Sequence, residues 1–265
     1  MQFNKSYFLI VALALIITSC KKENQEYDPN VKAELSVEFD NIAGSSDLQL
    51  NTGTYTNALG QSLKVTKLKY FVSNFKLTRV DGTVYTVPQN ESYFLIEEGN
   101  PAADHAMLNI PEGEYKSISF VLGVDSLRNT MDVSQRTGVL DVSGAASDMY
   151  WSWNSGYIFF RLDGTSPVIT AMGSVFQYHI GGFGGYSTPT ANNLRTITLD
   201  LSARGTAKVK EGKETNIHLM VDILKAISGT TNMDFSTTAM VHSVTGGVPL
   251  ANNCTAMFTH DHTEN

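Results

Sequence analysis

The chain has 265 residues and a formal net charge of −7, and 17% of its residues are charged. An acidic chain of this kind does not offer the basic surface that nucleic acids require, so no nucleic-acid partner is expected. With two cysteines, Cys20 and Cys254, the chain also lacks the cysteine count of a disulfide-stapled fold.

The first twenty residues resemble a bacterial lipoprotein signal. Lys5 precedes an apolar run, Tyr7–Ile17, that would span about 16 Å as a helix, roughly half of a bilayer core. Such a run is typical of a signal peptide and too short for a permanent membrane span. It ends in Ile17-Thr18-Ser19-Cys20, which looks like a lipobox, so residues 1–19 are expected to be removed and Cys20 to carry a lipid anchor. The alternative is an ordinary signal peptide with an incidental cysteine.

The residues after Cys20 predict the organisation of the mature chain. Residues 20–30 are polar and are expected to form a flexible tether. Lys21 stands where the common inner-membrane retention signal has Asp, which favours the outer membrane, facing the periplasm or the cell surface. Loss of residues 1–19 removes one lysine and no acid, which changes the formal charge from −7 to −8. Residues 31–265 are long for one domain, but all-β domains often reach this size.

Strand signals dominate residues 31–265. In Lys32–Asn41, the apolar residues Leu35, Val37 and Phe39 alternate with polar ones, which is the pattern of a half-buried strand. Asp81-Gly82 predicts a hairpin turn, because both residue types tolerate positive φ. Further strands are expected at Leu63–Val80, Thr83–Val87, Tyr93–Ile96, Tyr115–Leu122, Tyr150–Leu162, Val175–Ile180, Leu194–Leu201, Thr206–Val209, Ile217–Ile227 and, at the end of the chain, Met257–His260.

Helical signals are few. Ser126–Thr137 and Asp222–Ile227 are expected to hold no more than a turn or two of helix. Many short strands separated by turn residues predict an all-β fold, an antiparallel β-sandwich that forms a single domain with minor helical turns. The alternative architecture is a single domain with a helical insertion near residues 125–145.

The sequence carries no recognisable signature of catalysis. A Walker-type phosphate loop, a G-x-S-x-G elbow, an H-E-x-x-H motif and paired-cysteine zinc spacing are all missing. No nucleophile–base pair is visible, so the protein is not expected to be an enzyme. Asp125, Asn129 and Asp132 gather oxygen ligands as a calcium loop would, but the spacing fits no EF-hand, and a capped turn is favoured.

Aromatic and imidazole side chains are the remaining candidates for a site. Trp151 and Trp153 would share one face of a strand, where core packing is the plain interpretation. His179 precedes a glycine pair and is either a hydrogen-bonded structural residue or a metal ligand. His260 and His262 would project from one face of a strand and suit copper, zinc or nickel, unless they belong to a solvated tail.

Four more residues complete this set. His242 is a further candidate ligand, whereas His218 stands in an apolar run and is expected in the core. Asp261, between the two terminal histidines, would point away from them. Cys254 has no intramolecular partner once Cys20 carries lipid, so it is expected to be a buried or half-buried free thiol.

Five segments, among them the WSWNSGYIF block that starts at Trp151 and the YHIGG block that contains His179, together resemble the MbnP-like family of copper-binding proteins, many of which are lipoproteins of Bacteroidota-type bacteria. The WSWNSGYIF and YHIGG blocks are the most specific of them. The resemblance implies a β-sandwich with a copper-binding role in the periplasm or at the cell surface. The matching segments are LKYFVSNFKL (Leu68–Leu77), FVLGVDS (Phe120–Ser126), MYWSWNSGYIFFRLDG (Met149–Gly164), FQYHIGGFGG (Phe176–Gly185) and ANNCTAMF (Ala251–Phe258).

The resemblance also implies a modified tryptophan. Some relatives are encoded beside a di-haem peroxidase-like partner that oxidises a tryptophan to kynurenine, and in related copper proteins the kynurenine joins two histidines at Cu(I). Carried over to this chain, Trp151 or Trp153 would be the modified residue and His179 a copper ligand. The resemblance leaves the second imidazole open among His242, His260 and His262.

Two functions follow as hypotheses. The first is a membrane-anchored copper-binding protein for copper acquisition, storage or delivery. The alternative is a binding or adhesion sandwich without metal, which would recognise glycans through exposed Trp151 and Trp153. Cys254 departs from the family pattern, where an aromatic residue is usual, and its thiol is either structural or a copper ligand.

Overall fold

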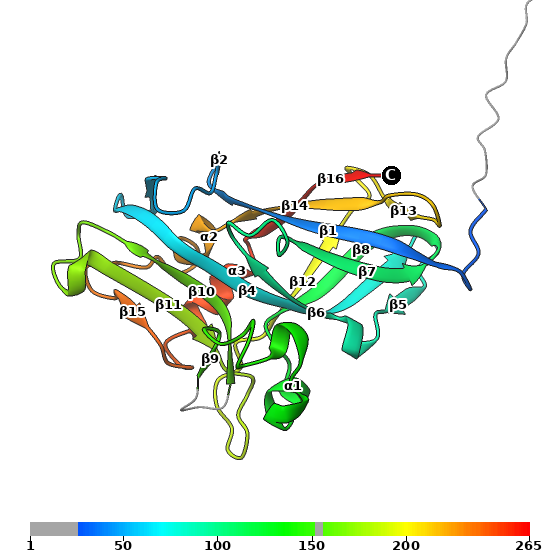
Figure 1. Cartoon of the computed structure of the whole chain (residues 1–265). Coiled ribbons are helices and arrows are strands. Elements are labelled where there is room, and N and C mark those ends of the chain that lie inside the picture. The colour runs from blue at the N-terminus through cyan, green and yellow to red at the C-terminus, as the bar shows by residue number, and fades with distance from the viewer. Residues whose placement is uncertain (1–25, 152–155) are drawn as a thin grey trace, which may run out of the picture.

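Two β-sheets face each other across a shared apolar core (Figure 1). The computed structural model describes residues 26–151 and 156–265, so the predicted signal peptide, Cys20 and Trp153 lie outside the described residues. Within the described residues the smaller sheet has five strands, ordered β16-β14-β1-β2, with β7 also paired to β1. Their bounds are β1 (Lys32–Ala43), β2 (Ser46–Asp47), β7 (His105–Pro111), β14 (Asn216–Asp222) and β16 (Phe258–Glu264).

The larger sheet has eleven strands in the described part of the chain, and its main path runs β12-β8-β4-β10-β11-β15. These six strands are β4 (Ser62–Arg79), β8 (Gly113–Leu122), β10 (Gly156–Thr165), β11 (Val175–Gly181), β12 (Arg195–Asp200) and β15 (Met240–Val241). Short strands pair beside this path, namely β3 (Tyr55–Thr56), β5 (Val84–Thr86), β6 (Tyr93–Glu97), β9 (Tyr150–Trp151) and β13 (Ala207–Val209). Single 3₁₀ turns lie at Gln89–Glu91, Val133–Gln135, Gly138–Leu140 and Met172–Ser174.

The apolar residues that alternate along β1 pack between the two sheets. Leu35, Val37 and Phe39 are at most 1% exposed, as the period of two predicts. The Phe39 ring packs edge-on against Tyr70 of β4 and Phe120 of β8, with centroids 6.2 and 5.6 Å apart. Each such buried side chain contributes about 1.5–3 kcal/mol to folding. These rings therefore hold the two sheets together.

The expectation of an all-β fold is confirmed, but the pairing is not purely antiparallel. β1 pairs with β14 and β11 pairs with β15 in parallel. Period and turn signals predict hairpins between neighbouring strands, whereas parallel pairs need long crossover connections that leave no local mark in the sequence. This difference matters for the candidate site, because His179 lies on β11 and His242 directly follows β15.

Helices are short, as expected. Two of them, α1 (Ser126–Thr130) and α2 (Leu224–Ile227), lie inside the predicted segments, and β14 ends before α2 begins. The helix α3 (Val248–Cys254) was not predicted, because seven residues are too few for a helical period to stand out. Its residue Cys254 is fully buried and free, which confirms the expected free thiol.

A second apolar cluster covers the outer face of the larger sheet. The predicted strand Tyr150–Leu162 is instead a hairpin of β9 and β10, with Gly156 opposite Trp151. Because Phe71, Tyr157 and Phe159 project outward from β4 and β10, the chain before β9 folds over them. The sheet is therefore buried on both faces here, where the first metal-site candidates lie.

Among the described residues, none of the helices is both long and apolar enough to cross a membrane. Glu26 and Asp28, at the end of the predicted tether, already contact residues that adjoin the strands β7, β8 and β13. The Asp28 amide donates to Glu112 Oε2 at 3.0 Å, and Lys210 Nζ donates to the Glu26 carbonyl at 2.9 Å. The boundaries at residues 19, 30 and 31 stay predictions.

Candidate metal centres

The parallel pairing of β11 with β15 brings two predicted ligands together. Gln177 lies opposite Met240 and Tyr178 opposite Val241, so the next residue on each strand is a histidine. The rings of His179 and His242 stack with their centroids 4.5 Å apart and their planes 24° from parallel. The sheet register thus joins two histidines that are distant in sequence. We call them the histidine pair.

Asp163 orients the first ring of the histidine pair. His179 Nε2 lies 2.7 Å from Asp163 Oδ1, and both residues are buried, at 8% and 7% exposed. Because a carboxylate only accepts, Nε2 carries the proton, and a neutral His179 ring presents Nδ1 as its free lone pair. A carboxylate behind a histidine in this way is the usual support of a metal-binding imidazole.

The charges around Asp163 keep it ionised. Its Oδ2 accepts from Arg161 Nε at 2.8 Å and forms an ion pair with Nη2 at 2.7 Å. Burial alone would raise the pKa of Asp163, but the hydrogen bonds from His179 and Arg161 outweigh burial and hold that pKa below its usual value. The ring of His179 therefore has a permanent acceptor.

The second ring is open to solvent. His242 follows β15 directly and is exposed. Partial burial, and then the nearby His179, lower the pKa of His242. Its imidazole is consequently neutral at physiological pH, which is the form that binds metal ions. An ion can reach the histidine pair from this side.

Trp151 lies on the same face as His179. Its indole packs over Gly181, because a Cβ atom built on that glycine would be 2.6 Å from Cζ3 of the indole. Gly181 and His179 are two residues apart on β11, so they share one face of the strand. Trp151 itself is 6% exposed. The second predicted tryptophan, Trp153, lies outside the described residues.

A row of nitrogen-bearing side chains crosses the outer face at the histidine pair. Lys69, Arg161 and His179 are register neighbours on β4, β10 and β11. Asp148 covers this row, since its carboxylate contacts Lys69 Nζ at 3.2 Å and its carbonyl accepts from Arg161 Nη1 at 2.7 Å. Glu97 contacts Lys69 Nζ at 2.9 Å. These contacts anchor the segment before β9, and hence Trp151, against the sheet.

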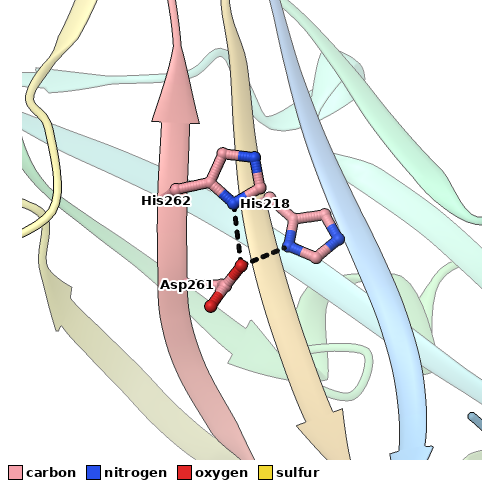
Figure 2. Close-up of side chains that lie close together, drawn as sticks. All are labelled: His218, Asp261 and His262. Atoms are coloured by element: carbon pink, nitrogen blue, oxygen red, sulfur yellow. Dashed lines mark hydrogen bonds and ion pairs between the residues drawn. The ribbon is translucent and has the colours of Figure 1, made fainter.

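A second cluster lies on the smaller sheet, between β14 and β16. Figure 2 shows Asp261 between His218 and His262, with its Oδ2 atom 3.4 and 2.8 Å from their Nδ1 atoms. One ligand atom from each residue lies within 4.8 Å of the other two. Among the described residues, these three are the one group of at least three His, Cys, Asp or Glu side chains this close together. We call them the terminal triad.

The terminal triad corrects the expected geometry of the last strand. His262 pairs with His218 and His260 pairs with Leu219, so Asp261 is an extra residue in a β-bulge. The bulge breaks the alternation, and Asp261 joins His262 instead of pointing away. His260 is not part of the triad, and its Nε2 lies 2.9 Å from Thr263 Oγ1. His218, expected in the core, lies on the polar face of β14.

The four predicted ligands therefore do not meet at one ion. The histidine pair lies on the larger sheet, and His260 and His262 lie on the smaller one. The sequence analysis did not identify Asp163 as the partner of His179. It also placed Asp261 and His218 away from any metal site. Asp163 is two residues from Arg161 in the FFRLDG segment, and this charged pair in an apolar strand was the available signal.

The predicted calcium oxygens serve other contacts. Asp125 caps α1 by accepting from the Arg128 amide, and Asp132 caps the turn at Val133–Gln135 by accepting from Ser134. Asn129 Oδ1 accepts from the Tyr157 amide at 2.9 Å. All three side chains thus already accept hydrogen bonds from the protein, and the loop gives no support for calcium. These are the capped turns that the spacing favours.

Cys254 is remote from solvent. The thiol is fully buried in the main core, and burial raises its pKa to about 12. A thiolate, the form that binds copper, is strongly disfavoured there. Its placement on α3 is that of a small apolar core residue.

The fold and the histidine pair define an all-β protein of two facing sheets with an imidazole site at one sheet edge. Within that class, the chain belongs to the MbnP family, whose profile matches residues 32–245. The solved structure of MbnP from Methylosinus trichosporium is similar, with a TM-score of 0.55, 16% sequence identity, and coverage of 80% of this chain and 82% of that one. At this identity the likeness concerns the fold. A comparison with curated proteins found no significant match.

Proposed function

We propose that this protein binds copper at the histidine pair and serves copper acquisition, storage or delivery rather than catalytic turnover. The observation that carries the proposal is the stacking of His179 on His242 at 4.5 Å, with Asp163 behind His179. Two imidazole donors suit copper. Membership of the MbnP family supports a copper-related role.

The donor set at the histidine pair fits a copper ion. His179 would supply Nδ1, since Nε2 is held by Asp163, and His242 would supply a neutral ring from the solvent side. Bound copper would be held for transfer, and one face of the pair stays accessible for the ion to enter and leave. Asp163 fixes the orientation and tautomer of His179, and Arg161 keeps Asp163 charged.

Trp151 is the candidate for oxidation among the described residues. Its indole covers Gly181, next to His179 on the same strand face. A kynurenine formed at Trp151 would lie beside the copper ligands. Its formation would cleave the indole C2–C3 bond with two equivalents of peroxide, used through a di-haem peroxidase-like partner, and hydrolysis would then release C2 as formate. Trp153 is the other candidate. Peptide mass analysis after co-expression with the partner would assign the modified residue, and an unmodified peptide in every preparation would contradict this part of the proposal.

The proposed location is the cell envelope. The lipobox-like residues before Cys20 support a lipid anchor, with the outer membrane as the destination. Radiolabelled palmitate incorporated into the wild-type protein, but not into Cys20→Ala, is the expected result. Equal labelling of both proteins, or of neither, would contradict the anchor.

Copper K-edge absorption of the Cu(I)-loaded protein tests the donor set. We expect imidazole nitrogen as the main scatterer and no thiolate sulfur, because Cys254 is buried. Scattering dominated by sulfur would overturn the proposed site. The metal-free alternative, glycan recognition through exposed tryptophans, is not favoured, since Trp151 is 6% exposed.

A further inference from the structure

We propose that the terminal triad, His218, Asp261 and His262, is a second metal site, which binds a divalent ion of the Zn²⁺ type. It is separate from the histidine pair and does not depend on the proposed copper function. The site joins β14 to β16, the final strand of the chain.

The spacing of the three ligand atoms matches a metal site. Ligand atoms around a tetrahedral Zn²⁺ stand about 3.3 Å apart, given bonds of about 2.0–2.1 Å. Asp261 Oδ2 lies 3.4 Å from His218 Nδ1 and 2.8 Å from His262 Nδ1. The ring centroids of His218 and His262 are 4.8 Å apart, and the angle between the ring planes is 32°. Small side-chain rotations would therefore place all three atoms around one ion.

His218 carries an unused ligand atom. Its Nδ1 is buried and has no hydrogen-bond partner in the described structure, and it faces Asp261 at a distance too long for a good hydrogen bond. A buried polar atom without a partner costs about 1–3 kcal/mol. A metal ion at Nδ1 would satisfy it.

Carboxylates stand behind both rings. His218 Nε2 faces Asp40 Oδ2 at 3.6 Å and Glu38 Oε1 at 3.9 Å, and His262 Nε2 faces Glu264 Oε1 at 3.5 Å. This is the arrangement that supports metal-bound imidazoles, in which one ring nitrogen binds the ion and the other faces an acid. Both rings thus turn Nδ1 inward and Nε2 toward an acid.

The surroundings favour a divalent cation. Glu38 and Asp40 also line an acidic hollow together with Asp47, Glu98 and Asp104. Arg204 is the opposing charge, and it contacts Asp261 through Oδ1 at 3.2 Å, which leaves Oδ2 for the ion. Two imidazoles and one carboxylate suit Zn²⁺ better than the softer Cu(I).

The site is accessible from solvent. The side chains of His262 and Asp261 are 45% and 36% exposed, whereas that of His218 is 16% exposed. A water molecule can complete the fourth position. Substitution of His262 is therefore the safest test, because it removes a ligand with little loss of packing.

Zn²⁺ alone, titrated into the full chain in competition with a chromophoric chelator, tests the site. We expect a roughly tenfold or larger loss of affinity in His262→Ala and in Asp261→Asn. The matched control is His260→Ala, two residues away and outside the triad, which should bind as the wild type does. Unchanged binding in both triad variants would overturn the proposal.

Two further measurements keep this site distinct from the copper proposal. In a crystal soaked with Zn²⁺, anomalous scattering should place the ion between His218, Asp261 and His262. Zn²⁺ should also bind to His179→Ala and His242→Ala with wild-type affinity. Loss of Zn²⁺ binding in those two variants, or an anomalous peak at the histidine pair alone, would assign the ion elsewhere and refute the second site.

Discussion

His242 stacks on His179 because two strands that are far apart in sequence pair in parallel register. One ring is buried and held by Asp163, and the other is exposed and free to meet an ion from solvent. In the proposed copper site, the buried His179 would be the fixed ligand and the exposed His242 the point of entry. The predictions below follow from the contacts that hold the pair.

Gly181→Ala should displace Trp151. A Cβ atom at position 181 would lie 2.6 Å from the indole and 2.6 Å from the Tyr157 carbonyl oxygen, so the indole must move. Such overpacking costs about 1–3 kcal/mol. We expect a changed tryptophan fluorescence spectrum and a lower free energy of unfolding in urea. Gly212→Ala is the control for the spectrum alone: its Cβ meets nothing within 4 Å, so the spectrum should match the wild type, although its φ of +74° makes the alanine cost stability as well. An unchanged spectrum in Gly181→Ala would contradict the placement of Trp151.

Asp163→Asn should weaken Cu(I) binding although it removes no ligand. The amide cannot replace both the acceptor for His179 and the ion pair with Arg161. Loss of such a supporting carboxylate typically costs about 10–100-fold in metal affinity. A competition titration checks this. Asp148→Asn is the control, because Asp148 contacts Lys67, Lys69 and Arg161 but not His179. Equal losses in both variants would mean that the sheet, rather than the ring, had been disturbed.

The fold was largely predictable from local patterns. Alternation in Lys32–Asn41 and the Asp81-Gly82 turn predicted β1 and the turn between β4 and β5, because period and turn chemistry are local properties. The partner of β11 was not predictable, since β15 has two residues and its pairing is set by tertiary contacts. The family resemblance implied that His179 is a ligand, and it left the second imidazole open among His242, His260 and His262.

Stability should fall in acid through Asp125. Burial alone would raise its pKa, but hydrogen bonds from Tyr93 and Asn74 outweigh burial and hold the pKa of Asp125 below its usual value. A group with a lowered native pKa stabilises the fold above its unfolded pKa, and this stabilisation is lost as the pH falls through the native pKa. The free energy of unfolding of the wild type should therefore decline below about pH 4.

Asp125→Asn tests that assignment. The variant should be less stable than the wild type at pH 7 by about 1.5–3 kcal/mol, the usual value for hydrogen bonds to a charged group, and the difference should shrink in acid. Asp132→Asn serves as the control, because asparagine caps a turn as well as aspartate does, and Asp132 is exposed. A constant difference between Asp125→Asn and the wild type from pH 7 to pH 3 would contradict the account.

Cys254 should be inert in the folded protein. With its pKa raised to about 12 by burial, the thiol should resist alkylation until the protein unfolds, as peptide mapping would reveal. Cys254→Ala should cost about 1 kcal/mol in stability, as small core truncations do, and leave Cu(I) affinity unchanged. Reduced copper affinity in this variant, with stability intact, would make the thiol a ligand.

The terminal triad could not be predicted from the sequence, because it depends on a β-bulge. The spacing of His260 and His262 predicts a shared face only in a regular strand. Because of the β-bulge, Asp261 rather than His260 lies beside His262. The third member, His218, comes from β14, and its apolar neighbours Ile217 and Leu219 concealed that it faces outward. Bulges depend on pairing with a partner strand and leave no reliable local signal.

Anaerobic Cu(I) competition against a chromophoric chelator tests the central claim most directly, with two matched double variants. The protein with His179→Ala and His242→Ala should lose copper affinity by about 100-fold or more, whereas the protein with His260→Ala and His262→Ala should keep it. His242→Ala alone, at an exposed position, should already weaken binding without unfolding the chain. Wild-type affinity in the His179→Ala, His242→Ala protein would contradict copper binding at the histidine pair.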